Sequence, residues 1–359
     1  MPASKIDRRM EAIAQRGQSP LFRKLRLTLG VLLLCRLGLH LPLPGLDPAI
    51  IGRIMETSEG AFMRISLFAL GVGPLFAAMT LAEIAAMLIP PFRQWQSARI
   101  ENAEFVRKLV LGASLLLAGV QGAGVAMAME RVAGLVVAPG LVFRIEIALT
   151  FAAATALLSW LAQKLTINGF GEGFWMLFAI PVIAGLPDDA FQMIRAEGTS
   201  APNSLAHAIE AFVLAIGVLV AAGLARRKLA DSPGAFAPKM IDVWPALLGT
   251  VLASYLTGAL RLATAGQMAA LDYGAPLHLA LVAVMIGLVA YVRSRDDQVS
   301  GLRPIWPLTL AQIFVCVGAE ALTIGSRLPV WLDGAGLVVA VAVMMSWLPA
   351  RAGAQLRVP

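Results

Sequence analysis

Glu83 is the only charged side chain in the apolar stretch FALGVGPLFAAMTLAEIAAMLIP. A carboxylate within an apolar segment of this length is a functional candidate by default, because burying it in lipid is costly. A neutral glutamic acid that is hydrogen-bonded inside a helix bundle explains the same residue, and the sequence leaves both interpretations open. The other polar candidates lie near the ends of apolar runs or have no identifiable partner, which favours structural roles for Glu146, Glu210, Glu320 and His207.

The apolar runs lack the residue patterns of a membrane-embedded enzyme. They contain no HExxH or GxSxG motif, no aspartate pair and no ligand-spaced set of His and Cys. Both cysteines, Cys35 and Cys316, fall within apolar runs, as expected for buried free thiols. We therefore expect no enzymatic activity, no metal site and no cofactor. The three histidines are scattered along the chain at His40, His207 and His278.

The stretch that contains Glu83 is interrupted by Gly71, Gly73 and Pro74. Inside a helix, glycine is about 1 kcal/mol and proline about 3 kcal/mol less favourable than alanine. A membrane tolerates irregular backbone only where protein buries it or where it lines a water-filled cavity. The break therefore indicates a cavity beside this segment. The apolar stretch before it, Ala61–Leu70, would span about 15 Å as a helix, so we expect it to re-enter rather than cross.

Composition places these segments in an integral membrane protein. The chain has 359 residues, of which 58% are hydrophobic and 14% charged, and its mean hydropathy is +0.78. Soluble domains carry about 25% charged residues. The net charge of +7 is interpreted as a signal for membrane orientation and not as a nucleic-acid-binding surface. The first apolar run begins only near Leu27, after a polar, basic N-terminus, so we expect no cleavable signal peptide.

Ten apolar runs approach the roughly 20 residues that a spanning helix requires. They lie near residues 22–41, 72–90, 108–127, 144–163, 172–187, 206–225, 241–262, 276–293, 304–324 and 334–349. Lys and Arg gather in the even-numbered connections and at the two ends of the chain, which places both termini in the cytoplasm. The odd-numbered connections carry only Arg53, Arg64, Arg131, Arg144, Arg195, Arg261 and Arg327.

The predicted fold class is an all-α membrane protein with ten transmembrane helices in two five-helix halves. The fifth span is short and contains Pro181, and the second is broken; such helices commonly mark a pathway between two repeats. The expected segments are a cytoplasmic N-terminal segment (1–21), an N-terminal half (22–187, with the re-entrant stretch near 60–70), an external loop (188–205), a C-terminal half (206–349) and a cytoplasmic tail (350–359).

Three stretches, in this order, carry a resemblance to a known family. CRLGLHLPLPGLD (35–47), FALGVGPLFAAMTLAEIAAMLIP (68–90) and TINGFGEGFWMLFAIPVIAGLP (166–187) resemble the SecY family of protein-conducting channels. They correspond to the end of the family's first helix, the junction between its plug and second helix, and the entry to its fifth helix. Weaker likenesses at 243–256 and 332–347 match helices seven and ten, so the resemblance covers nearly the whole chain.

The resemblance implies two pseudo-symmetric halves around a central hourglass pore that conducts unfolded polypeptides. An apolar constriction suits such cargo, and it resists ions by dewetting. The pairs 76/80 and 174/178 are spaced i,i+4, so each pair lies on one helix face. Three phenylalanines and a threonine replace residues that are mostly isoleucine-like in the family. By the resemblance, the pore ring consists of Phe76, Thr80, Phe174, Phe178, Leu247 and Val339.

The resemblance also assigns a plug, a hinge and a lateral gate. The plug would occupy roughly residues 60–70, and the glycines and proline after it would let it swing aside. The plug and hinge residues are Met63, Ile65, Phe68, Leu70, Gly71, Gly73 and Pro74. The gate is a seam through which signal sequences leave the pore, and it would be lined by Leu81, Glu83, Thr250 and Val251.

The largest departure from the family is in the cytoplasmic loops. The loops after helices six and eight, which in the family dock the ribosome or the SecA motor, are reduced to ARRKLADSPGAFAPKMID and RSRDDQVSGLRPIW. The first keeps a basic cluster of Arg226, Arg227 and Lys228, whereas Asp296 and Asp297 dilute the charge of the second. We expect a polypeptide substrate, SecE-like and SecG-like subunits in the cytoplasmic membrane, and weak or no binding of SecA or the ribosome.

The alternative function is a secondary transporter with broken helices at the membrane midplane. Such a transporter needs a cluster of polar or charged midplane residues for substrate and ion. Glu83 alone does not make such a cluster, so the sequence gives little support for a transporter. The function we predict is therefore a protein-conducting channel, specialised and reduced in its loops.

Overall fold

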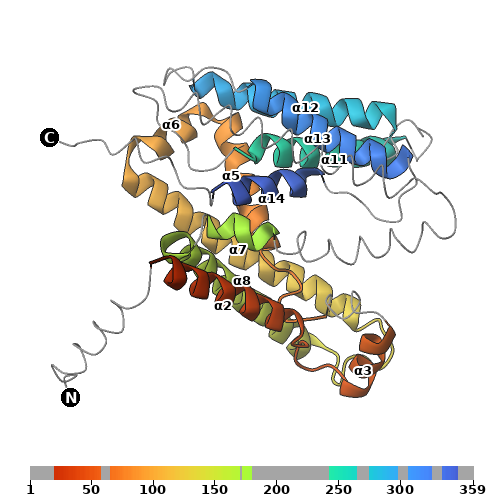
Figure 1. Ribbon diagram of the computed structural model, residues 1–359. Helices are drawn as coiled ribbons and strands as arrows, with labels where there is room; N and C mark the ends of the chain where they lie inside the picture. Colours follow the sequence, from red (N-terminus) through yellow and green to blue (C-terminus); the bar gives the residue numbers. More distant parts are fainter. Residues whose placement is uncertain are drawn as a thin grey trace, which may run out of the picture. The chain divides into compact units, whose positions relative to one another are not determined.

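The computed structural model describes residues 20–57, 65–169, 172–179, 242–264, 275–297, 306–325 and 334–346. The regular elements in these ranges are helices, as the sequence predicts. The described residues also form two isolated β-bridges, Pro42 with Ser66 and Leu46 with Val136. The chain divides into two compact units, Met1–Phe178 (unit 1) and Ala179–Pro359 (unit 2). Figure 1 labels the helices of both units.

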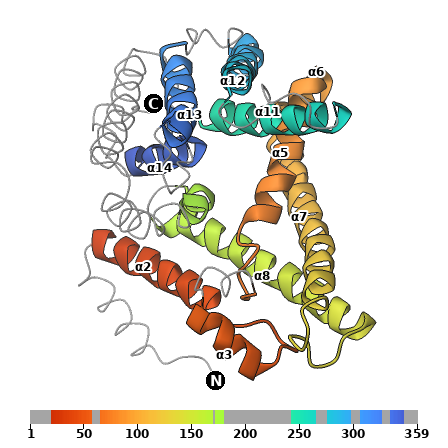
Figure 2. The same ribbon diagram turned by 90° about the vertical axis from the view of Figure 1, so that its right-hand side faces the viewer.

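Unit 1 is built on a hairpin of two long apolar helices, α7 (Ile100–Met129) and α8 (Leu141–Asn168). α5 (Gly73–Leu88) and α6 (Pro90–Ala98) pack against α7, and α2 (Pro20–Leu39) packs against α8, as the views in Figures 1 and 2 show. A short helix at residues 173–179 follows α8.

Small residues allow α7 and α8 to approach closely. Ser114, Ala118, Gly122 and Ala126 recur every four residues on α7, and all four are buried. A Cβ at Gly122 would lie 3.1 Å from Ala148 Cα of α8. Stripes of small residues are a common basis of helix packing in membranes, where apolar burial between helices contributes little.

The segment after α2 is held on both sides by backbone hydrogen bonds. Leu43 N donates to Ile65 O (3.0 Å) and Leu67 N to Leu41 O (2.8 Å), while Asp47 N donates to Leu135 O (2.9 Å). The loop after α2, the loop before α5 and the α7–α8 connection are thereby joined. Their apolar side chains form a core together with the facing ends of α7 and α8, comprising Leu43, Leu46, Ile51, Ile65, Ala126, Met129, Leu135, Phe143, Ile147 and Phe151.

Helix α3 (Pro48–Thr57) was not predicted, although the sequence carries the signals for its start. Asp47 Oδ1 accepts a hydrogen bond from Ala49 N at 2.8 Å, which is a capping interaction. Pro48 occupies the first helical position, where the missing N–H of proline costs nothing. At ten residues, α3 is half the length of a membrane span.

A sharp bend separates α5 from α6. The helices Gly73–Leu88 and Pro90–Gln96 meet at 114°. Pro90 cannot continue α5, because proline lacks the N–H that the helix would require and restricts the residue before it. α5 thus ends at Leu88, close to the end predicted near residue 90, whereas the helix that follows was not predicted.

Unit 2 contains α11 (Trp244–Ala263), α12 (Pro276–Asp297), α13 (Trp306–Gly325) and α14 (Gly334–Ser346). α11 packs against the other three helices. Glycines set two of the close contacts, because a Cβ at Gly249 would lie 2.6 Å from Ile286 Cα and one at Gly334 would lie 2.6 Å from Cys316 Cα. Cys35 and Cys316 are both buried and neither belongs to a disulfide, as predicted.

In the described ranges, four helices are long and apolar enough to cross a membrane: Ile100–Met129, Leu141–Asn168, Trp244–Ala263 and Pro276–Ser294. The bent pair α5–α6 raises this number to five if it forms one span. α13 and α14 provide shorter apolar stretches, and α2 carries four cations. The predicted sixth span, at 206–225, and the second half of the fifth lie outside the described residues.

Candidate functional site

Three of the predicted pore-ring residues form one aromatic cluster in unit 1. The ring centroids of Phe76 and Phe178 are 5.0 Å apart, and those of Phe174 and Phe178 are 6.3 Å apart. Trp175 joins the cluster with its centroid 4.9 Å from that of Phe174. Phe76 lies in the first turn of α5, directly after the break, and the other three lie on the helix at 173–179. The cluster thus joins the start of α5 to the helix that follows α8.

Thr80 lies one turn beyond Phe76 on α5, at the i,i+4 spacing predicted for one helix face. Its side chain is buried, and its hydroxyl has no hydrogen-bond partner among the described residues. Buried polar groups are hydrogen-bonded in the great majority of cases, so an unpaired hydroxyl calls for a specific explanation. The position coincides with the predicted pore ring.

The remaining ring residues belong to unit 2. Leu247 is buried in the first turns of α11, and Val339 is fully buried in the middle of α14. Each is apolar and helical, as predicted. Because these two residues belong to unit 2 and the other four to unit 1, the closure of a six-residue ring stays a prediction.

The predicted plug is not a helix in its described part. Residues 65–72 form turns, with one bridge between Ser66 and Pro42. The expectation of a half-helix at 61–70 is therefore wrong for residues 65–70. The physical reason is competition for hydrogen bonds, because the backbone at Ile65 and Leu67 pairs with the loop after α2 and the residues that follow close tight turns instead of a helix.

The described plug residues are anchored within unit 1. Phe68 is buried with its ring against Gly38 of α2, at a distance that leaves no room for a Cβ on the glycine. Ile65 belongs to the core of unit 1, and Ser66 is fully buried. Leu70 packs at the edge of the same core.

The backbone of the predicted hinge adopts conformations that glycine and proline favour. Gly71 has φ +52°, in the left-handed region where a side chain is strained. Its N–H donates to Phe68 O at 2.8 Å, and Gly73 N donates to Leu70 O at 3.0 Å. Pro74 lies in the first turn of α5, where helices tolerate proline. Consecutive tight turns thus connect the plug segment to α5.

The predicted gate residues lie on one helix of each unit. Leu81 of α5 is exposed and Glu83 is partly exposed, so the carboxylate is not sealed in the core of unit 1. On α11, the Thr250 hydroxyl donates to Ala246 O at 2.9 Å, and Val251 is partly buried.

Several predicted residues lie outside the described part of the chain. They are the plug residue Met63, the polar residues His207 and Glu210, and the basic cluster of Arg226, Arg227 and Lys228. Their assignments stay predictions.

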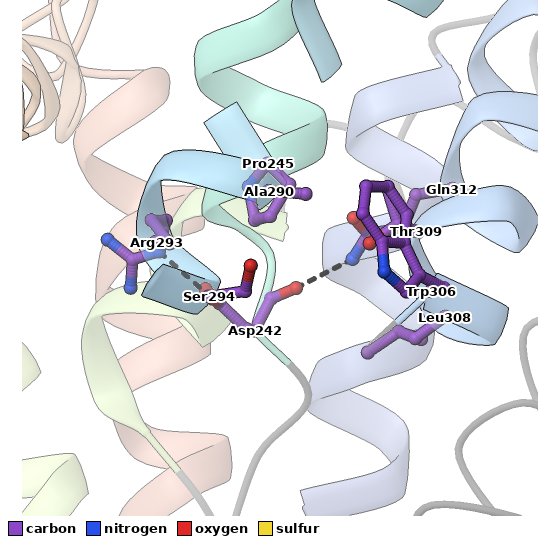
Figure 3. Close-up of a pocket in the computed structure, with 9 residues that line it drawn as sticks. All are labelled: Asp242, Pro245, Ala290, Arg293, Ser294, Trp306, Leu308, Thr309 and Gln312. Carbon is purple, nitrogen blue, oxygen red and sulfur yellow. Dashed lines mark hydrogen bonds and ion pairs between the residues drawn. The ribbon is translucent and has the colours of Figure 1, made fainter. Parts of the chain in front are cut away.

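Unit 2 also contains a pocket, lined by both polar and apolar side chains, that was not predicted from the sequence (Figure 3). Asp242, just before α11, accepts a hydrogen bond from Arg293 Nε of α12 at 3.0 Å and from Trp244 N at 3.2 Å. Gln312 Nε2 of α13 donates to Asp242 O at 2.6 Å. Asp242 therefore connects the start of α11 to α12 and α13. The paired residues are 51 and 70 positions apart in the sequence, so no local pattern predicts that they meet.

A second polar cluster in unit 2 was also not predicted. Thr257 of α11, His278 of α12 and Glu320 of α13 are all buried and in hydrogen-bond contact. In the sequence, His278 is one of three scattered histidines and Glu320 has no identifiable partner. Only the packing of the three helices brings these residues together.

Comparison with known proteins agrees with this architecture. The SecY family model matches residues 66–230. The protein translocase subunit SecY of Rickettsia bellii (strain RML369-C) is 26% identical over 234 residues, which cover 60% of this chain and 54% of that protein. The SecY of Escherichia coli (strain K12) is 28% identical over 193 residues, covering 48% and 43%. The chain thus spans about half the length of the curated relatives it matches.

Two solved structures share the fold over 91% of each chain. One concerns a SecY protein whose plug domain stabilises the closed state of the translocation channel, with 14% identity and a TM-score of 0.52. The other is Sec61 in the canine ribosome–channel complex from the endoplasmic reticulum, with 12% identity and a TM-score of 0.53. The described helices therefore define an integral membrane protein with the SecY and Sec61 fold. The chain is therefore similar to the SecY family in sequence over residues 66–230 and to SecY and Sec61 in fold.

Proposed function

We propose that the protein is a channel that moves unfolded polypeptides across the cytoplasmic membrane or inserts them into it. The observation that carries this proposal is the aromatic cluster of Phe76, Phe174 and Phe178, next to the break that begins α5. These residues are the aromatic part of the expected pore ring, and Phe76 meets the other two although it lies far from them in the sequence. Apolar rings without fixed charges suit a passage for polypeptides of any sequence.

The proposed pore runs between two halves of five spans each, residues 22–187 and 206–349. The distribution of Lys and Arg supports cytoplasmic positions for the N-terminal segment 1–21 and the tail 350–359. Segment 188–205 would then be an external loop. The ring would be completed by Thr80, Leu247 and Val339, and it would be closed from the external side by the segment at 60–70.

The proposed lateral gate opens between α5 and α11. Leu81 and Glu83 would face Thr250 and Val251 across a seam through which a signal sequence reaches lipid. The exposed side chain of Leu81 and the partly exposed carboxylate of Glu83 support this proposal, because neither is fully covered by unit 1. A disulfide between cysteines at Leu81 and Thr250 should form and should block transport, whereas unimpaired transport by the crosslinked protein would contradict the gate.

The proposed partners are small SecE-like and SecG-like membrane subunits, with weak or no binding of SecA and the ribosome. Stable protein interfaces bury roughly 1,200–2,000 Å², and the two shortened cytoplasmic loops provide few charged contacts. The protein should therefore fail to support growth of a SecY-depleted strain. Rescue of growth with SecA-dependent secretion would show that it is a general translocase.

Ion conductance of the purified protein in planar bilayers tests whether the aromatic cluster is a constriction. Replacing both Phe174 and Phe178 with Ala should raise the conductance of the open channel, because a wider neck stays wet. Phe105→Ala is the matched control, since Phe105 is exposed on α7. Equal conductance of all three proteins would show that the cluster packs helices and does not line a pore.

A further inference from the structure

The end of α5, all of α6 and the first turns of α7 form a bent segment in unit 1, which we call the elbow (residues 88–108, Figure 1). α6 turns away from α5 by 114°. Spanning helices are tilted from the membrane normal by about 20° on average. If α5 crosses the membrane in this way, α6 lies closer to the membrane plane than to the normal. The bend is then the end of a span, and α6 follows the surface of the bilayer.

Aromatic contacts and a hydrogen bond hold α6 against α7. The ring of Trp95 lies 6.2 Å from that of Phe92, in a stacked arrangement, and 6.1 Å from that of Phe105, edge to face. Asn102 Nδ2 of α7 donates to Trp95 O at 2.7 Å. The elbow is therefore an ordered structure with a fixed surface and not a loose connection.

The surface of the elbow is apolar and basic at the same time. Five of its large apolar side chains are between 43% and 82% exposed: Leu88, Ile89, Trp95, Ile100 and Phe105. Three cations among them are also exposed, namely Arg99, Arg107 and Lys108. Water suits the cations but not a continuous apolar patch, and hydrocarbon suits the patch but not the charges. The boundary between lipid headgroups and acyl chains suits both.

The length of α7 independently places its first turns outside the hydrocarbon. A helix of 30 residues is about 45 Å long, whereas the hydrocarbon core is about 30 Å thick. The charged residues of α7 all lie at its start, between Glu101 and Lys108, and the stretch from Leu109 to Met129 has none. The uncharged stretch is long enough to cross, so the charged turns lie at the level of the headgroups.

α8 carries a second mark of the interface at the same end of the hairpin. Trp160 is 53% exposed, and Lys164 Nζ lies 5.5 Å from the centroid of its ring. Because α7 and α8 run in opposite directions, the last turns of α8 lie beside the first turns of α7. Trp and long cationic side chains are enriched where a protein passes through the membrane–water interface.

We propose that the elbow is an interfacial anchor whose partner is the phospholipid surface. Trp95, Ile100 and Phe105 enter the boundary between headgroups and acyl chains, and the three cations meet the phosphates. Nothing in this inference requires transport, because it concerns only how unit 1 is held at one face of the membrane.

Spin-label accessibility in lipid vesicles tests the proposal. The labels would be attached to Ala98→Cys and Ile100→Cys, two exposed positions of the elbow, in the full-length protein. The two buried native cysteines, Cys35 and Cys316, would first be replaced with Ala. Oxygen concentrates in the hydrocarbon and a nickel chelate stays in water, so the two collision rates report the depth of each label. Vesicles of phosphatidylethanolamine and phosphatidylglycerol provide the membrane.

We expect both labels to lie at the level of the headgroups, between two reference labels. Leu116→Cys, exposed in the middle of α7, marks the hydrocarbon, and Arg131→Cys, exposed in the α7–α8 connection, marks water. Elbow labels that match either reference would overturn the proposal. Low collision rates with both reagents would overturn it as well, because they would show that protein and not lipid covers the elbow.

Trp95→Gln should shift the Ala98 label toward water, because the variant loses the aromatic side chain that anchors α6. Val132→Gln is the matched control, since Val132 is 49% exposed at the opposite end of the hairpin. An unchanged depth of the label in both variants would contradict an anchoring role for Trp95. The comparison of the elbow labels with the two references stands whether or not the Trp95 variant folds.

Discussion

The ring of Phe68 lies directly against Gly38, so that the segment before the α5 break rests on the last turn of α2. Phe68 N also donates to Gly38 O at 3.3 Å. Glycine is required here by close approach, since any Cβ would meet the phenyl ring. The contact locks the predicted plug segment, residues 65–70, to α2.

Gly38→Leu should displace Phe68 and loosen the plug segment. In planar bilayers this variant should conduct ions under conditions in which the wild-type protein is silent. Gly30→Leu, on the same helix, is the control, because a Cβ there meets no atom within 4 Å. Equal, low conductance of both variants would indicate that the segment packs unit 1 and does not seal a pore.

Deleting Ala61–Leu70 should also raise ion conductance, but at a cost in stability. The resemblance alone suggests that a plug occupies the channel mouth and adds little to the stability of the fold. In this structure, however, Ile65 is part of the core and Ser66 is fully buried. Removing one large buried aliphatic side chain typically costs about 2–5 kcal/mol. The deletion variant should therefore unfold at a lower temperature than Gly38→Leu, and an unchanged melting temperature would contradict the anchored arrangement.

These residues show what the sequence could and could not reveal. The break at Gly71–Pro74, the end of the span near residue 90 and the i,i+4 pairing of Phe174 with Phe178 follow from local rules on helix-breaking residues and helix periodicity. The turns at 65–70 cannot be predicted from local rules, because they depend on backbone hydrogen bonds with the loop after α2. His278 and Glu320 meet only through the packing of α12 and α13, which no spacing in the sequence encodes.

Gly122→Leu should destabilise the α7–α8 hairpin. Adding a side chain to a well-packed contact costs about 1–3 kcal/mol, and the facing backbone at Ala148 cannot move aside easily. Gly124→Leu is the matched control, since Gly124 lies on the same helix, is exposed and has no atom within 4 Å of the added Cβ. Denaturant unfolding of both variants would measure the difference, and equal stability would contradict the close packing.

Acid should weaken the ion pair that closes the same hairpin. Glu130 Oε2 accepts hydrogen bonds from Arg144 Nη2 at 2.6 Å and Nε at 2.9 Å, and Oε1 accepts one from Gly140 N at 2.8 Å. The Arg144 hydrogen bond, followed by that from Gly140, lowers the pKa of Glu130. Its stabilising contribution is therefore present above the pKa of an unfolded glutamate and is lost as the pH falls through the lower folded value.

Glu130→Gln should remove this part of the pH dependence while keeping the shape of the side chain. Wild type and variant should differ most near neutral pH and converge in acid. Arg131→Gln is the control, because Arg131 is exposed in the same connection. A constant difference between wild type and Glu130→Gln at every pH would rule out the charge of Glu130 as the cause.

Crosslinking to a polypeptide in transit tests the central claim most directly. Photoreactive residues placed at Phe76 and Phe174 should capture an unfolded polypeptide that is stalled during transport by a folded domain at its end. The same residues placed at Leu116 and Leu149, which are 71% and 65% exposed on α7 and α8, should not capture it. Capture from Phe76 and Phe174 alone is the result we predict. Transport without capture at either position, or equal capture at all four, would contradict a polypeptide pathway past the aromatic cluster.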